Sequence, residues 1–231
     1  MLRRQFMRAT LLASPGAAAV LWPAAGWAQL TETDAASGVR AALQRGAEVA
    51  VEQLGRTDGF LGNPKVRIPL PGFLNDAAKI LKATGQQKRV DELVTTMNRA
   101  AEAAMPEAKL LLVSAVKSMS VEDGRRILTG GDDSVTQFFA GKTREPLTER
   151  FLPVVTKQTE RLALADKYNA VAGKAAGFGL VRKQDANIQQ YVTGKALDGL
   201  YLMIAEEERK IRTDPVGTGS AILKKVFGSL R

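Results

Sequence analysis

The residue types present in this sequence restrict the chemistry that the protein can perform. The chain of 231 residues contains no cysteine and no histidine. These types supply thiolate nucleophiles, imidazole bases and the usual zinc and haem ligands, so acid–base catalysis would depend on carboxylates. One candidate pair, Glu102 and Glu107, lies on either side of Pro106, where a helix junction would bring the two together. The favoured alternative places Glu107 in the first turn of a helix, where the dipole stabilises an anion, and pairs Glu102 with Arg99 or Asn98.

A second possible catalytic pair is Ser114 and Lys117. Their Ser-x-x-Lys spacing is the one at which penicillin-interacting enzymes place a nucleophilic serine one helical turn from the lysine that activates it. The companion Ser-Asp-Asn and Lys-Thr-Gly elements are absent from the sequence. Because a short pair of this kind often arises by chance, we favour two ordinary helix residues over a hydrolase site.

Three polar residues, Asn98, Arg99 and Glu102, interrupt an otherwise alanine-rich helical segment. Their positions allow a buried polar network, because residues three or four apart lie on the same face of a helix. Together with Arg67 from a preceding extended segment, they form the best candidate for a binding site. The sequence predicts no catalytic residue and no cofactor there.

The stretch ILTGGDDSV, residues 127–135, places two glycines and two aspartates between apolar segments. We favour a joint between two helices, in which Gly130 takes a left-handed conformation and Asp132 or Asp133 caps the next helix. The alternative is a calcium or magnesium site formed by Asp132 and Asp133 with Glu122 or Asp123. The spacing differs from that of an EF-hand loop, which argues against the metal site.

The first 28 residues have the features of an export signal. MLRRQFMR is basic, a moderately apolar run follows, and the small residues of GWA predict cleavage after Ala28 and a periplasmic location. RRQFMR, residues 3–8, is similar to a twin-arginine signal, with an ordinary Sec signal as the alternative. Glycine and proline interrupt the apolar run before it reaches about 18 residues, which argues against an uncleaved membrane anchor. We also expect no transmembrane segment in the mature chain.

The mature chain would carry a mild positive charge. The whole chain has 33 basic and 24 acidic residues, and removal of Arg3, Arg4 and Arg8 with the signal leaves a net charge of +6. This charge favours an acidic envelope protein or anionic lipid as a partner. Basic and acidic residues alternate instead of forming a basic block, and no RNA-binding aromatic pattern is present, so nucleic acid is not expected.

The elements that must position these residues are helical almost throughout, because apolar residues recur in steps of three and four. Residues 55–71 alone look extended, with turn signals at Asp58-Gly59 and Asn63-Pro64. The sequence therefore predicts an all-α, bundle-like domain over residues 29–214. Caps and prolines divide it into helices at about 34–54, 72–84, 88–104, 106–119, 120–128, 143–150, 154–176 and 185–214.

Three of these helices have sequence features that place individual residues. Ser120 and Asp123 resemble a capping box at the start of one of them. The last helix should begin near Asp185 and carry Glu206, Glu207 and Glu208 on its solvent-exposed side. Thr143 is expected to cap the helix that follows it.

A tether and a short amphipathic helix, residues 215–231, follow the domain. The helix has Ile222 and Phe227 on its apolar side and Lys224 and Lys225 on the other. We favour packing of the apolar side onto the bundle, since about ten residues bury too little apolar area to hold a membrane alone. The alternative is docking on a membrane or a partner.

Several stretches in this order resemble a bacterial family of exported proteins known as domain of unknown function 4197. They are GFLGNPKVRIPLP, MNRAAEAAMPEAK, ILTGGDDSVTQFF and YVTGKALDGLYLMIAEEERKIRTDP, and the resemblance covers nearly all of the mature chain. It implies a mainly helical periplasmic protein and supplies no activity. The chain departs from the family pattern at residues 216–219, VGTG.

These features favour a non-catalytic periplasmic helical protein that binds an envelope partner, an amphiphile or a membrane surface. The alternative is a hydrolase that uses carboxylates or the pair Ser114 and Lys117. A cleft in which two such groups converge would indicate an enzyme, whereas an apolar pocket or exposed patch would indicate binding.

The export signal can be tested with a reporter protein that accepts only twin-arginine transport. Fusion of residues 1–29 should send the reporter to the periplasm, because the paired arginines are the recognised feature. Changing Arg3→Lys and Arg4→Lys together should abolish reporter activity in the periplasmic fraction. Export that survives the double change would identify a Sec signal instead.

Overall fold

The computed structural model describes residues 32–74, 78–80, 83–160, 163–179, 182 and 187–214. The predicted export signal lies outside these residues. So does the C-terminal segment 215–231, with the candidate docking residues Ile222, Lys224, Lys225 and Phe227.

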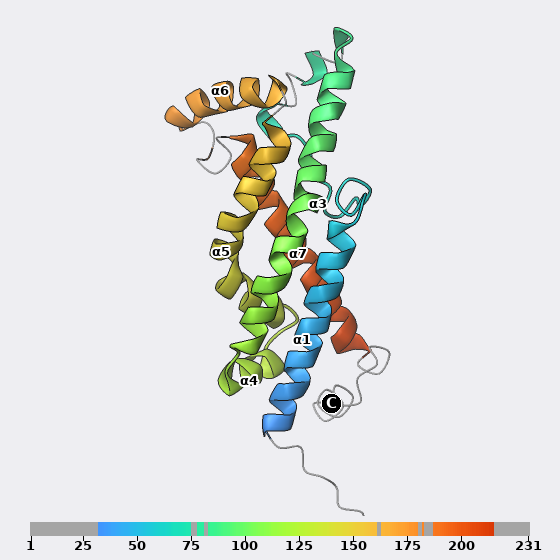
Figure 1. Cartoon of the computed structure of the whole chain (residues 1–231), viewed down its shortest axis with the longest axis vertical. Helices are drawn as coiled ribbons and strands as arrows, with labels where there is room; N and C mark the ends of the chain where they lie inside the picture. Colours follow the sequence, from blue (N-terminus) through green and yellow to red (C-terminus); the bar gives the residue numbers. More distant parts are fainter. Residues whose placement is uncertain are drawn as a thin grey trace, which may run out of the picture.

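Four long helices run side by side along an elongated molecule (Figure 1). A shorter helix, α4, lies at one end, and α6 lies across the other (Figure 1). The described residues contain no strand, so the predicted all-α, bundle-like fold is confirmed. The elements are α1 (Glu32–Gly55), η1 (Gly72–Leu74), α3 (Gln87–Lys117), α4 (Val121–Thr129), α5 (Ser134–Thr159), α6 (Ala163–Gly177) and α7 (Ile188–Thr213).

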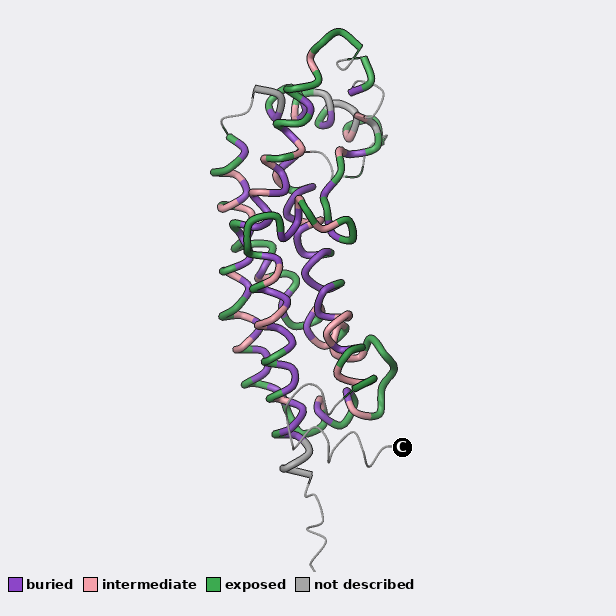
Figure 2. The backbone as a smooth tube through the Cα atoms, turned by 90° about the vertical axis from the view of Figure 1, so that its right-hand side faces the viewer, coloured by how far each residue is buried: buried purple, intermediate pink, exposed green. Residues whose placement is uncertain are grey.

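The core runs along the length of the bundle, where the inward faces of the long helices are buried (Figure 2). Removal of this apolar surface from water is the main force that holds the helices together, at roughly 1.5–3 kcal/mol for each large side chain. Fully buried members from α1, α3, α5 and α7 include Leu54, Met97, Met105, Leu112, Phe139, Phe151 and Leu200.

Pro106 and Pro153 do not divide helices, contrary to the sequence prediction. Helix α3 continues through Pro106, and α5 continues through both Pro146 and Pro153. A proline inside a helix removes one hydrogen bond and costs about 3 kcal/mol. Buried apolar residues continue along α3 and α5 on both sides of these prolines, so burial of the whole stripe outweighs that cost.

Other helix ends agree with the sequence in part. The capping box at the start of α4 is confirmed: Ser120 Oγ accepts from Asp123 N–H at 3.0 Å, and Asp123 Oδ2 accepts from Ser120 N–H at 3.1 Å. Helix α7 begins after Asn187, whose side chain caps it, instead of after Asp185. The prediction that Thr143 caps a helix is wrong, because Thr143 lies inside α5 and donates to Phe139 O at 2.7 Å.

The segment between α1 and η1 is an ordered loop of turns that packs against the bundle. Its apolar residues Phe60, Val66 and Ile68 are buried. Gly199 of α7 permits this packing, since a Cβ atom there would lie 2.7 Å from the Phe60 ring and 3.3 Å from Val66 Cβ. Within the described residues, no helix is both long enough and apolar enough to span a membrane.

Two glycines of α7 provide a matched test of this packing. Gly199→Ala should destabilise the protein by about 1–3 kcal/mol, because the wholly buried Phe60 ring has to move. Gly194→Ala should be neutral or stabilise by up to about 1 kcal/mol, since a Cβ atom there meets nothing within 4 Å. Chemical denaturation measures both. Equal effects of the two changes would refute the close approach of the loop to α7.

Candidate functional site

The predicted polar network exists, and it fastens the loop 56–71 to α3. Asn98 is wholly buried, and its Oδ1 accepts from Ile68 N–H at 2.8 Å. Its Nδ2 donates to Ile68 O at 3.0 Å and to Val94 O at 2.8 Å. The side chain therefore pairs with the backbone of an extended segment as a neighbouring strand would, satisfying groups that are costly to bury unpaired.

Glu102 secures the other end of the same loop. Its Oε1 accepts from Phe60 N–H at 3.0 Å and from Leu61 N–H at 3.1 Å. Its Oε2 accepts from Arg99 Nη1 at 2.7 Å, and Arg99 Nη2 reaches Asp58 Oδ1 at 2.8 Å. The bond to Glu102 is the largest cause of a raised pKa at Arg99, so this guanidinium stays charged. The network holds the loop in place.

The remaining residues singled out in the sequence are not brought together with this network. Arg67 is exposed, and its Nη1 lies 3.4 Å from Leu61 O within the same loop. Glu107 forms an ion pair with Arg150 of α5 at 3.6 Å and takes no part in the bonds that Glu102 makes. Ser114 and Lys117 both lie on the exposed surface of α3.

The ILTGGDDSV stretch joins α4 to α5, but its residues act differently from the prediction. Gly130 has φ −80°, so it is not left-handed. It is required because a Cβ atom would lie 2.6 Å from Arg126 O and 2.7 Å from Ser134 Cβ. Asp133 does not cap α5; its Oδ2 accepts from the Gln137 side chain at 2.8 Å. Asp132 is exposed, and no three acidic side chains gather as a metal site among the described residues.

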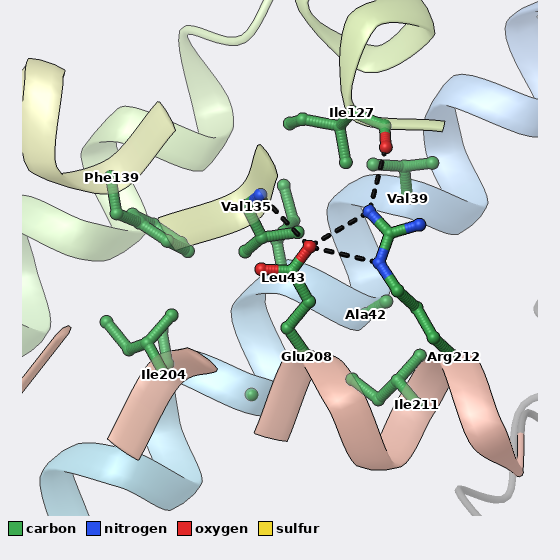
Figure 3. Close-up of a pocket in the computed structure, with 12 residues that line it drawn as sticks. Val39, Ala42, Leu43, Ile127, Val135, Phe139, Ile204, Glu208, Ile211 and Arg212 are labelled. Atoms are coloured by element: carbon green, nitrogen blue, oxygen red, sulfur yellow. Dashed lines mark hydrogen bonds and ion pairs between the residues drawn. The ribbon is translucent and has the colours of Figure 1, made fainter. Parts of the chain in front are cut away.

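The start of α5 is capped instead by Glu208 of α7, which the sequence pattern wrongly placed on the solvent side. Glu208 is 4% exposed, and its carboxylate accepts from Val135 N–H at 3.2 Å (Figure 3). It also accepts from Thr136 N–H at 3.2 Å. Arg212 donates to the same carboxylate at 2.9 Å and to Ile127 O in α4 at 2.9 Å. The pair thus ties α4 and α5 to α7.

Around this ion pair lies a small apolar cleft between α1, α5 and α7 (Figure 3). Its walls include Val39, Leu43, Phe139 and Ile204, and its internal volume is about 20 Å³. That volume holds about one water molecule. The cleft is therefore a packing feature of the core and has no room for an amphiphile.

A larger, open groove of about 550 Å³ lies between α5 and α7. Successive turns of α5 contribute Arg144, Thr148 and Leu152. The facing side of α7 contributes Gln190, Thr193, Gly194, Leu197 and Asp198, with Tyr191 and Lys195 beside them and Arg182 from the preceding connection. Its volume falls within the range of about 300–1,000 Å³ that is typical of small-molecule sites.

Basic side chains dominate the charge of this α5/α7 groove. Asp198 is its one acid among the described lining residues, and it forms ion pairs with Arg144 and, at 3.8 Å, with Lys195. The Arg144 guanidinium also lies 5.5 Å from the centre of the Tyr201 ring. Burial raises the pKa of Tyr201, so its hydroxyl is neutral where it meets Thr143 Oγ1 at 3.0 Å. These contacts fix Arg144 at the edge of the groove.

Sequence reasoning missed both Glu208 and the α5/α7 groove. The groove had a weak signal, since Arg144, Thr148 and Leu152 recur every four residues on α5. The partner face on α7 follows the same spacing from Gln190 to Asp198. Which two faces meet depends on the packing of the whole bundle, so spacing alone could not pair them.

One protein-family model, described as "Protein of unknown function (DUF4197)", matches residues 29–228. This match confirms the resemblance found in the sequence. Comparisons with curated proteins and with solved structures give no significant match.

The capping role of Glu208 can be separated from the roles of other nearby acids. Glu208→Ala should lower the free energy of unfolding by about 3–5 kcal/mol, because it removes the carboxylate partner of the partly buried Arg212 and the cap of α5. Glu207→Ala on the same helix, and Asp133→Ala in the joint, should each cost about 0.5 kcal/mol or less. Urea unfolding monitored by circular dichroism measures all three.

A loss at Asp133→Ala as large as that at Glu208→Ala would restore Asp133 as the cap of α5. A stable Glu208→Ala variant would contradict the structural role of the ion pair.

Proposed function

Because the chain belongs to the DUF4197 family, whose description gives no activity, we propose from its sequence and its structure that it is an exported, non-catalytic protein that binds a ligand of the cell envelope. The observation that carries this proposal is the open α5/α7 groove. It combines the volume of a ligand site with basic, polar and apolar lining residues.

The interior polar residues support a binding protein over a hydrolase. Asn98, Glu102 and Glu208 already bond to backbone groups of other segments, so their side chains hold the fold together. Catalysis by a pair of groups requires a nucleophile or acid within hydrogen-bond reach of its base. Glu107 is instead paired with Arg150, on the other side of Pro106 from Glu102.

The envelope location rests on the N-terminal sequence. The basic start, the apolar run and the small residues before Gln29 have the form of an export signal. The ligand that an exported protein meets belongs to the envelope, and a net charge of +6 after signal removal favours an acidic one. An acidic protein or an anionic lipid would satisfy this condition.

This function can be tested with a small-molecule and lipid extract of the bacterial envelope. The purified mature protein should retain an extract component in native mass spectrometry, and its melting temperature should rise by about 5 °C or more, since a ligand that binds only the folded state stabilises it. Gly194→Leu should abolish both effects, because the new side chain fills the open space beside Gly194 in the α5/α7 groove.

Gly141→Leu is the matched control. Gly141 is another helical glycine with open space beside it, and it lines a different pocket. This variant should bind like the parent protein. Retained binding by Gly194→Leu, or chemical breakdown of an extract component by the protein, would contradict the proposal.

A further inference from the structure

Thr193 is the unusual residue in the α5/α7 groove. It is 1% exposed, and its hydroxyl is one of two buried side-chain polar atoms without a partner among the described residues. Buried threonines of α5 behave differently: Thr143 donates to Phe139 O at 2.7 Å and Thr159 to Val155 O at 2.9 Å. An unsatisfied buried hydroxyl costs roughly 1–3 kcal/mol, so an acceptor from outside the chain would be stabilised here.

Two cations, Arg144 and Lys195, line the same groove as this hydroxyl and have donors that are not used within the described residues. Arg144 uses Nη2 for Asp198, and its Nε and Nη1 bond to no other described residue. Lys195 Nζ lies 3.8 Å from Asp198 Oδ2, which is too long for a hydrogen bond. Asp198 therefore positions both cations, and each can still donate to a further acceptor.

The set of donors favours a phosphate over a carboxylate. A hydroxyl, a guanidinium and an ammonium come from two different helices, so one ligand group must offer acceptors in several directions. Phosphate has at least three acceptor oxygens and forms charge-assisted bonds with Arg and Lys, whereas a carboxylate has two oxygens in one plane. The carboxylate of Asp198 already pairs with Arg144 and Lys195 in the groove, so a ligand has to use their remaining donors.

The rest of the groove is suited to a hydrocarbon group. Leu152 and Leu197 are apolar lining residues, and Gly194 leaves open space beside it. A glycine inside a helix costs about 1 kcal/mol relative to alanine. A Cβ atom at Gly194 would meet no neighbour within 4 Å, so packing does not require glycine there.

We propose that the α5/α7 groove binds a phosphate-bearing amphiphile. The Thr193 hydroxyl donates to a phosphate oxygen, Arg144 and Lys195 neutralise the phosphate, and Leu152 and Leu197 contact the hydrocarbon part. This inference rests on the proposed binding function and names the ligand class of the same groove. The source of the ligand is either a membrane phospholipid or a soluble phosphate ester.

Octyl phosphate is a suitable probe. Inorganic phosphate, which lacks the hydrocarbon chain, and octyl glucoside, which lacks the phosphate, are its two controls. Calorimetric titration of the mature protein at low salt should give saturable binding of octyl phosphate. Inorganic phosphate alone and octyl glucoside should each bind at least about tenfold more weakly, because each lacks one set of contacts. Equal binding of octyl phosphate and octyl glucoside would overturn the inference.

Three substitutions test the residues. Thr193→Val keeps the shape and removes the hydroxyl, so the affinity for octyl phosphate should fall about tenfold while the protein stays as stable or becomes more so. Thr193→Ser should keep the affinity within about threefold of the parent, since the hydroxyl remains. Lys195→Gln should weaken binding and reduce its salt dependence. Lys142→Gln is the matched control, because this exposed lysine of α5 lies outside the groove.

Unchanged affinity in Thr193→Val would overturn the inference. Competition by vesicles of phosphatidylglycerol, but not of phosphatidylcholine, would support it with a membrane lipid as the source, and no competition would support it with a soluble ester. If the protein retains an envelope component but does not bind octyl phosphate, only the proposed ligand class is overturned. If it binds neither the extract component nor octyl phosphate, the proposed function is overturned as well.

Discussion

Buried backbone groups that have no helical partner must find one elsewhere, and this requirement organises the molecule. Asn98 and Glu102 supply partners for the loop between α1 and η1, and Glu208 supplies them for the start of α5. Each of these side chains reaches from one helix to the backbone of another segment. Without them the loop and the α4–α5 joint would bury unpaired polar groups at a cost of several kcal/mol.

The same requirement separates the parts that hold the fold from the part that can bind. The side chains of Asn98, Glu102 and Glu208 are engaged by backbone groups, whereas the α5/α7 groove keeps a Thr193 hydroxyl without a partner among the described residues and an unfilled space at Gly194. Both features cost stability in the isolated chain. Departures from the most stable choice are expected where a protein binds something, which is why the groove carries the functional proposal.

The sequence predicted the helical class, the extended loop and the capping box of Ser120 and Asp123, because these depend on local spacing and local bonds. It failed at Pro106, where burial along the whole of α3 outweighs a local helix breaker. It failed again at Glu208, since a run of three glutamates does not reveal that one of them meets the end of another helix. Contacts between distant helices depend on packing that local patterns do not contain.

Ligand binding is expected between α5 and α7, whereas the network around Glu102 only holds the fold. Amide chemical shifts from nuclear magnetic resonance, recorded during a titration with octyl phosphate, test this expectation most directly. The largest changes should fall at residues 144–152 and 190–198, with little change at residues 56–71. Changes concentrated around Asp58, Arg99 and Glu102 would contradict this expectation and would indicate a binding site at the loop 56–71.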